Sequence, residues 1–232
     1  MTYISEQDYQ SLVHMNQEKS VMNKPCIIII LNIFILCTNT SCSKPQPEPD
    51  DINNYKTVTI GSQVWMAENL RNPHLPHKSV DNNAANDNEL GYLYSWENAM
   101  NACPPGYHLP TSREFETLLN YVEIQKSSKS TFLALRKKDP KWKNDPSQEG
   151  DEFGFSALPA GTFFRIFEET KDNALFWSST EDFGGAAALV MKVDQARDSA
   201  YLLAHGKDDY YNPHFSVRCI KDTPSPEPTP QQ

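Results

Sequence analysis

The amino-acid sequence predicts an α+β domain in which two helices pack on short antiparallel sheets that are joined by long loops. Apolar residues with helical spacing occur between residues 96 and 122, in the first part of the folded region. Later in the chain, apolar runs of strand length are separated by Gly, Pro and charged residues, which is typical of antiparallel strands and their turns. Early helices followed by a series of strands favour the α+β class.

The folded region is predicted to begin with a β-hairpin. Residues 55–60, Y-K-T-V-T-I, alternate in the way that a half-buried strand does, and Gly61-Ser62 is the expected turn. Residues 63–66 are the expected returning strand. A loop over residues 71–89, rich in Asn, Asp, His and Pro, leads from this hairpin to the first helix.

The first helix is predicted to follow G-Y-L-Y-S-W, residues 91–96, and to carry Ala99, Met100 and Ala102. Pro104 and Pro105 must end it, because proline cannot continue the helical hydrogen-bond ladder. Three tryptophans lie in apolar blocks and are expected in the core, namely Trp65, Trp96 and Trp177.

The second helix is predicted from about Ser112 to Val122. Thr111 is a good N-cap, and Glu114 three residues later completes the pattern of a capping box. One face of this helix is apolar and consists of Phe115, Leu118, Leu119 and Val122. His108 precedes the cap, and we interpret it as a packed histidine in a structural hinge rather than as a catalyst.

The second half of the folded region contains a long loop and a set of predicted strands. The loop covers residues 137–151 and is dominated by charged residues, Pro and Trp142. Strand-length apolar runs follow it at 153–164, 175–181, 186–193 and 216–221.

Both ends of the chain are predicted to lie outside the fold. The apolar run Cys26–Cys37 has about 12 residues, fewer than the roughly 20 that a membrane-spanning helix needs, so residues 1–41 are interpreted as a signal peptide with an upstream extension. The Pro-rich segments 42–54 and 223–232 are expected to be an extended spacer and a disordered tail. The domain itself is expected over residues 55–222.

The segment T-N-T-S-C-S around Cys42 resembles a bacterial lipobox, in which the cysteine thiol is acylated. We therefore expect an exported lipoprotein of the outer membrane that contacts the membrane through its lipid anchor alone. Plain signal cleavage and an uncleaved anchor are the alternatives. The sequence leaves the face of the membrane and the oligomeric state open.

The formal net charge of −9 argues against a nucleic-acid partner, because such proteins usually carry a basic stripe. Of the five cysteines, Cys103 and Cys219 are the two left within the expected domain. Outside the cytoplasm such a pair most often forms a disulfide, and two buried thiols or a metal pair are the alternatives.

Five blocks in order resemble the Fibrobacter succinogenes major paralogous domain, a family of exported lipoproteins of Bacteroidetes and Fibrobacter. They cover residues 57–222 and read V-T-I-G-S-Q-V-W-M-A-E-N-L, G-Y-L-Y-S-W-E-N-A-M-N-A-C-P-P-G-Y-H-L-P-T-S-R-E-F-E-T-L-L, F-G-F-S-A-L-P-A-G, F-W-S-S-T-E and F-S-V-R-C-I-K-D. The ordered set is far more specific than any single block.

The spacing of Trp96, Ala99 and Cys103, followed by G-Y-H-L-P, is also similar to the C-type lectin-like fold. That resemblance implies a lectin-like arrangement and a disulfide between Cys103 and Cys219, the cysteine of V-R-C-I. The same V-R-C-I ending is similar to the formylglycine-generating enzyme family, a catalytic variant of that fold.

The resemblance favours a surface-tethered, non-catalytic module that binds a glycan or another cell-surface ligand. Exposed aromatic rings suit sugar faces, and long loops usually carry such sites. The candidate ligand-binding residues are Trp142, Asn144 and Asp145 in one loop and Asp208, Asp209, Tyr210, Tyr211 and Asn212 in another.

The cofactor question is left open. The W-N-D tripeptide that holds Ca²⁺ in sugar-binding C-type lectins is missing from the segment before the last predicted strand. Asp208, Asp209 and Asn212 supply oxygen ligands of the type that Ca²⁺ requires, so Ca²⁺ stays an alternative to a module without a cofactor.

Two further functions are weighed against the glycan-binding module. The first is a protein-binding structural or adhesion component of the cell envelope. The second is a polysaccharide-active enzyme or an oxidase; adjacent carboxylates occur at Glu181-Asp182 and Asp151-Glu152, but glycoside cleavage needs two carboxylates that face each other. Ser178 and Ser179 lack the G-x-S-x-G context of a nucleophile. No catalytic residue is therefore expected.

Overall fold

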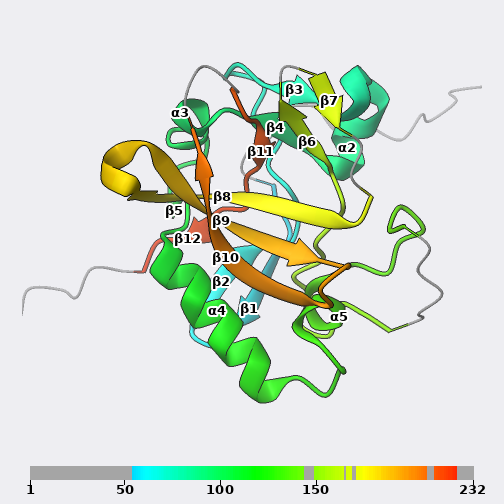
Figure 1. Cartoon of the computed structure of the whole chain (residues 1–232). Coiled ribbons are helices and arrows are strands. Elements are labelled where there is room, and N and C mark those ends of the chain that lie inside the picture. The colour runs from blue at the N-terminus through cyan, green and yellow to red at the C-terminus, as the bar shows by residue number, and fades with distance from the viewer. Residues whose placement is uncertain (1–53, 144–148, 165, 169–170, 208–211, 224–232) are drawn as a thin grey trace, which may run out of the picture. The chain divides into compact units, whose positions relative to one another are not determined.

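The computed structural model describes residues 54–143, 149–164, 166–168, 171–207 and 212–223. The expected signal peptide, Cys42, the spacer and the tail after residue 223 lie outside the described residues. Within them the chain is an α+β domain with few helices and mainly antiparallel strands, as the sequence predicts (Figure 1). None of the helices in these ranges combines the length and apolar character that membrane crossing requires.

The largest sheet has six strands in the order β10-β9-β8-β11-β4-β3. All neighbours are antiparallel except β11 and β8, which run parallel. The strands are β3 (Lys78–Ser79), β4 (Tyr92–Tyr94), β8 (Asn173–Asp182), β9 (Ala187–Asp194), β10 (Ser199–Gly206) and β11 (Phe215–Ser216).

Two smaller sheets complete the fold. The first has four strands in the order β1-β2-β12-β5, and the second is the antiparallel pair β6-β7. Their strands are β1 (Thr57–Ile60), β2 (Gln63–Met66), β5 (Tyr107–His108), β6 (Thr162–Phe164), β7 (Ile166–Glu168) and β12 (Ile220–Lys221). The predicted hairpin of residues 55–66 is confirmed, and Gly61 has the positive φ of 62° that its turn requires.

The centre of the six-stranded sheet is buried on both faces. Successive residues of β8 point to opposite faces, so Phe176 joins one apolar cluster and Trp177 joins the other. The first cluster lies under α4 and α5 and also contains Trp65, Phe115 and Phe155. Trp65 and Trp177 are fully buried, which confirms their prediction as core residues.

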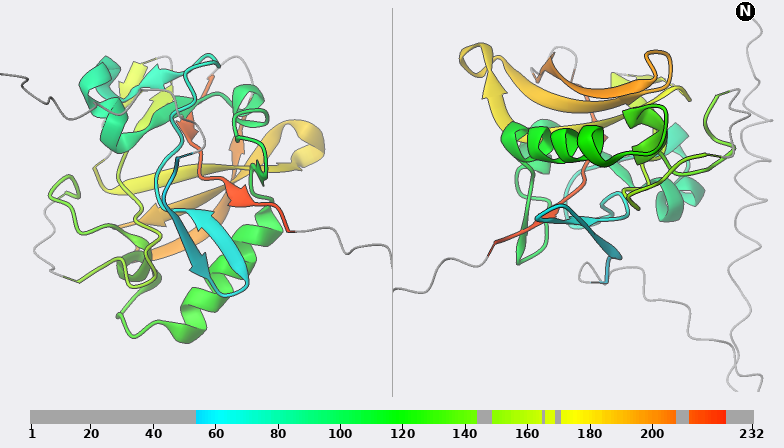
Figure 2. Two further views of the ribbon diagram at one scale, coloured as in Figure 1. Left: turned by 180° about the vertical axis from the view of Figure 1, so that it is seen from behind. Right: turned by 90° about the horizontal axis from the view of Figure 1, so that it is seen from below.

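The α-helices within the described residues are α2 (Asp87–Leu90), α3 (Trp96–Ala99), α4 (Ser112–Gln125) and α5 (Thr131–Leu135). Both α4 and α5 pack on β9 and β10, and Figure 2 shows α4 lying along that part of the sheet. The capping box of α4 is confirmed: Thr111 Oγ1 accepts from the amide of Glu114 at 3.2 Å, and Glu114 Oε2 accepts from the amide of Thr111 at 2.7 Å.

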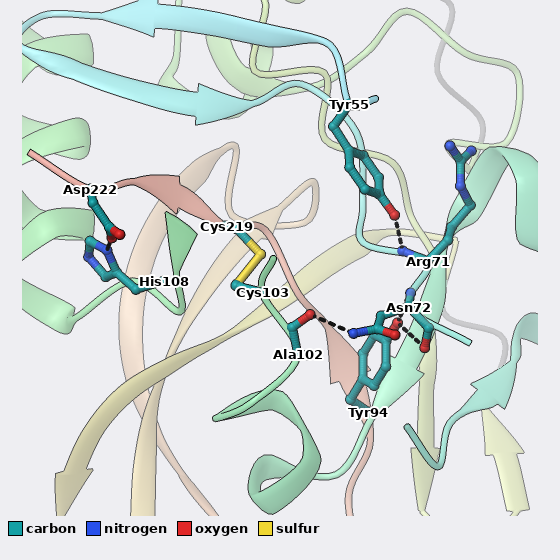
Figure 3. The surroundings of a disulfide bond; sticks show 9 residues. All are labelled: Tyr55, Arg71, Asn72, Tyr94, Ala102, Cys103, His108, Cys219 and Asp222. Atoms are coloured by element: carbon teal, nitrogen blue, oxygen red, sulfur yellow. Dashed lines mark hydrogen bonds and ion pairs between the residues drawn. A yellow bond between two sulfur atoms is a disulfide. The ribbon is translucent and has the colours of Figure 1, made fainter. Parts of the chain in front are cut away.

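A disulfide joins Cys103 to Cys219, as the lectin-like resemblance implies (Figure 3). The two residues are 116 positions apart in sequence, and their Cα atoms are 5.9 Å apart. Cys219 directly precedes β12, which pairs with β2 on one side and with β5 on the other. The bond therefore ties the segment after α3 to the middle of the four-stranded sheet.

The structure differs from the predicted elements in several places. Only residues 162–164 of the predicted strand 153–164 form a strand, and the predicted strand 216–221 is divided between β11 and β12, which belong to different sheets. The predicted loop 71–89 contains β3 and the start of α2. The strand β10 was not predicted, although it pairs with β9 along its full length. Residues 92–94 form the strand β4 rather than the start of a helix. The helix α3 has only four residues, because Ser95 caps its N-terminus and turns follow its C-terminus. The second helix continues past Val122 to Gln125.

Candidate functional site

A groove of about 340 Å³ lies where three segments distant in sequence meet: the start of β3, the first turn of α3, and the chain between β10 and β11. In Figure 1, α3 and β3 lie at the end of the domain opposite α4. The lining residues are mostly polar and surround one indole ring, so we call this site the Trp96 groove. They are Pro76, His77, Lys78, Ser95, Trp96, Glu97, Asn98, Lys207, Asn212 and His214.

The start of α3 positions the indole. Ser95 is the N-cap and its hydroxyl accepts from the amide of Asn98 at 3.4 Å, so residues 96–98 form the first turn at the wall of the groove. The indole Nε1 of Trp96 donates to the carbonyl of Ser178 at 2.9 Å. Trp96 is half-buried, so its prediction as a core residue is only partly right.

Lys207 covers one face of this indole. Its Nζ lies 3.6 Å from the Trp96 ring centroid and also forms an ion pair with Glu181. A cation over an indole face is attracted by the ring quadrupole, and the ion pair holds the ammonium in place. These two contacts hold Lys207 in the lining of the groove.

Two histidines, His77 and His214, also line the groove. The His77 ring stacks on Tyr92 with centroids 3.8 Å apart, and its Nδ1 lies 2.8 Å from the carbonyl of Leu75. A carbonyl can only accept, so Nδ1 carries the proton and a neutral His77 keeps Nε2 as an acceptor. His214 is buried, and burial lowers the pKa of its imidazole.

Two amide side chains complete the polar lining. Asn98 donates its Nδ2 to the carbonyl of Pro76 at 3.1 Å, which ties α3 to the chain before β3. Asn212 has a positive φ of 41° that asparagine tolerates better than most residues, and its carbonyl lies 2.8 Å from Nδ1 of His214. The groove thus presents an aromatic ring, amides, the exposed carboxylate of Glu97 and an ammonium within one small volume.

Of the ligand-binding residues predicted from the sequence, Asn212 alone both lies in the described part of the chain and lines this groove. Trp142 is 2% exposed and its ring packs edge-on against Phe132, with centroids 5.0 Å apart. Burial therefore removes Trp142 from the candidate site, because its faces are not open to a ligand. The remaining candidates lie outside the described residues, namely Asn144, Asp145, Asp208, Asp209, Tyr210 and Tyr211.

The adjacent carboxylates considered for glycoside cleavage have structural partners. Glu181 pairs with Lys207, and Asp182 accepts from the amide of Phe183 at 2.8 Å. Asp151 accepts from the amide and the hydroxyl of Ser156. Glu152 accepts four hydrogen bonds from Ser127 and Ser128, and these bonds lower the pKa of its carboxyl to about 2.

Metal ligation was also considered. Within the described ranges, no group of three or more His, Cys, Asp or Glu side chains is placed to hold a metal ion. Cys103 and Cys219 form a disulfide with each other, so they are neither metal ligands nor free thiols in this structure.

These features define a disulfide-linked α+β domain with a polar groove built around one tryptophan. The chain belongs to the family described as the Fibrobacter succinogenes major domain, whose model matches residues 58–221. The resemblance seen in the five ordered sequence blocks is thereby confirmed. The comparison with curated proteins found no match, and the comparison with solved structures found none either.

Proposed function

We propose that this chain is a non-catalytic, surface-tethered module that binds glycan in the Trp96 groove. The observation that carries the proposal is the juxtaposition of the Trp96 indole with the side chains of Asn98, Asn212 and Glu97 in a volume of about 340 Å³. Sugar C–H groups stack on aromatic rings, while amides and carboxylates bind sugar hydroxyls. Volumes of roughly 300–1,000 Å³ are typical of small-molecule sites.

The proposal includes a C-type lectin-like fold. In support, the disulfide links the segment after α3 to the residue before β12, and the capped helix α4 begins soon after Cys103. This is the connectivity that the sequence resemblance implies. It also includes tethering through acylated Cys42 at the outer membrane, which rests on the sequence of residues 24–54.

The test is a glycan array probed with the oxidised full-length chain, with Ca²⁺ and again with a chelator. We expect saturable binding that falls in Trp96→Ala, Asn98→Ala and Asn212→Ala. Each lost hydrogen bond or stacking contact should weaken binding by roughly five- to tenfold, because such contacts contribute about 1–1.5 kcal/mol. If glycan binding is lost when the chelator is present, the binding requires Ca²⁺.

Matched controls separate the groove from the rest of the surface. Phe183→Ala removes an exposed aromatic ring elsewhere, and Asn101→Ala removes an exposed amide that does not line the groove. Both should bind as the unmodified chain does. A blank array for a folded, disulfide-bonded sample, or equal losses in the control variants, would contradict glycan binding at this groove.

A protein ligand is the second candidate, and one observation favours it. Phe183 is 72% exposed in the turn between β8 and β9, which projects from the body of the domain in Figure 1. An exposed aromatic ring on a projecting turn can anchor a contact with a protein partner. If no glycan on the array binds, a protein ligand that contacts this turn becomes the favoured proposal.

A further inference from the structure

A second cavity, of about 330 Å³, opens between the start of β1, the segment after β2, α2 and the residues that follow α5. It shares no lining residue with the Trp96 groove. Its charged lining consists of four cations and two carboxylates, namely Lys56, Arg71, Lys137, Arg218, Glu68 and Glu89. We call it the Arg218 pocket. An excess of positive charge in one pocket stands out on a chain whose formal net charge is −9.

Arg218 lies behind the pocket surface and is 0% exposed. Its guanidinium donates to the carbonyls of Met66 and Phe155 and to Oδ1 of Asn69, the last at 2.5 Å. Its Nε has no hydrogen-bond partner among the described residues. Burial lowers the pKa of Arg218 to about 9, so the group keeps its charge at neutral pH.

The charge of Arg218 has no ion-pair partner of its own. Its hydrogen-bond acceptors are neutral oxygens, and in the described part of the chain no carboxylate lies within ion-pair distance of it, so the charges of Asp151 and Glu68 act on it only from farther away. A buried charge without such a partner is costly. An anion in the adjoining pocket would lower that cost through the intervening protein, where screening is weak.

The two carboxylates at the pocket wall are already shared between cations. Glu68 lies 3.4 Å from Arg71 and 3.9 Å from Lys56. Glu89 lies 2.7 Å from Lys141 and 3.9 Å from Lys137. Asp139 also lies 3.9 Å from Lys137 and 3.5 Å from Lys141, so four cations face three carboxylates at this wall and positive charge is in excess before Arg218 is counted.

We propose that the Arg218 pocket binds the carboxylate group of a small organic acid, with sugar acids as the class that fits it. When Asp139 and Lys141 at the wall and Asp151, whose charge acts on Arg218, are counted with the lining residues, five cations face four carboxylates, so the carboxylate of a monoacid matches the excess of one positive charge. A doubly charged phosphate would leave the site with an excess of negative charge. Ala67 and Leu158 give the wall an apolar part against which the body of such a ligand can pack. The volume accommodates one monosaccharide-sized ligand.

The test is an NMR titration of the ¹⁵N-labelled, oxidised full-length chain with D-glucuronate, D-glucose and inorganic phosphate as separate probes. We expect glucuronate to shift the amide signals of Ala67, Asn69 and Ser156 and to bind more weakly as salt is added. Lys56→Gln and Lys137→Gln should each weaken binding by roughly fivefold, since one charge at about 4 Å in water contributes about 1 kcal/mol.

Lys129→Gln is the matched control, because Lys129 is exposed and does not line the pocket. Trp96→Ala should also keep glucuronate binding, which separates this site from the Trp96 groove. The proposal is overturned if glucose binds as tightly as glucuronate or if phosphate binds more tightly. It is also overturned if the two lysine variants bind like Lys129→Gln, or if no signal moves at about 10 mM glucuronate.

Discussion

His108 links two parts of the domain through its two ring nitrogens. Its Nδ1 lies 2.7 Å from Asp222 Oδ1, and its Nε2 lies 2.8 Å from Glu114 Oε1 (Figure 3 shows the pair with Asp222). Both partners are carboxylates, so both nitrogens must donate and the protonated imidazolium fits best. Burial lowers the pKa of His108, but the hydrogen bonds that it donates to Asp222 and Glu114, together with the charges of these two carboxylates, outweigh burial, and the net pKa is raised.

This raised pKa predicts a pH-dependent contribution to stability. A group that binds its proton more tightly in the folded state stabilises the fold below its unfolded pKa of about 6.5, and the contribution is lost as pH rises through the folded pKa. The free energy of unfolding of the unmodified chain should therefore fall, relative to that of His108→Gln, as pH rises from the unfolded pKa of about 6.5 through the raised folded pKa.

The expected size of that change is a few tenths of a kcal/mol to about 1 kcal/mol, because the side chain is 40% exposed and solvent screens the pairs. Urea denaturation at a series of pH values measures it. A difference between the two proteins that does not vary with pH would contradict the prediction.

At the scale of single elements, α4 depends on its N-terminal cap. Thr111→Ala removes the acceptor for the amide of Glu114 and should lower the free energy of unfolding by about 1 kcal/mol. The measurement is the urea midpoint at unchanged slope. Thr117→Ala is the control, because Thr117 lies on the exposed side of the same helix and should change stability by less than about 0.5 kcal/mol. Equal effects of the two changes would contradict the capping role.

Sequence reasoning works best for elements whose signals are local. The capping box is a three-residue spacing and the β1-β2 hairpin is a short alternating pattern, and both are confirmed. The strand β10 was missed because S-A-Y-L-L-A-H-G carries no strict alternation. This segment is a strand because it pairs with β9, and the sequence of one segment does not reveal which other segment it pairs with.

The candidate site depends on contacts that no local pattern reveals. Trp142 lies between two lysines in the sequence, which predicts an exposed side chain. In the structure its ring packs against Phe132 and holds the loop on the core. Trp96 stands in an apolar block, yet Ser95 starts a helix there and leaves the indole at a groove wall. The Trp96 groove joins residues 76–78 to Lys207, Asn212 and His214, and only the folded sheet brings them together.

At the scale of the whole molecule, the Cys103–Cys219 disulfide is the one covalent link across the described fold. In the chain-entropy model a closed loop of this length contributes about 4–5 kcal/mol, and measured losses for native disulfides are about 2–5 kcal/mol. We expect reduction of the unmodified chain to lower its free energy of unfolding by that amount, measured by urea denaturation with and without a thiol reductant.

Reduction leaves both sulfur atoms in place, so it separates the cross-link from packing. Cys103→Ala with Cys219→Ala should lose more than reduction does, because Cys219 is fully buried and its removal also leaves a cavity. Identical urea midpoints for the oxidised and reduced chains would show that the link does not contribute to stability.

The position of β12 also sets the order in which the domain can form. The strand β12 lies between β2 and β5 in the four-stranded sheet. The β1-β2 hairpin is synthesised first, but its sheet cannot be completed until residues 220–221 have been synthesised. Contacts that span nearly the whole domain close late and slowly. The four-stranded sheet therefore cannot be completed until synthesis of the domain has reached its last strand, and the Cys103–Cys219 bond can form only once the two ends of the domain have met.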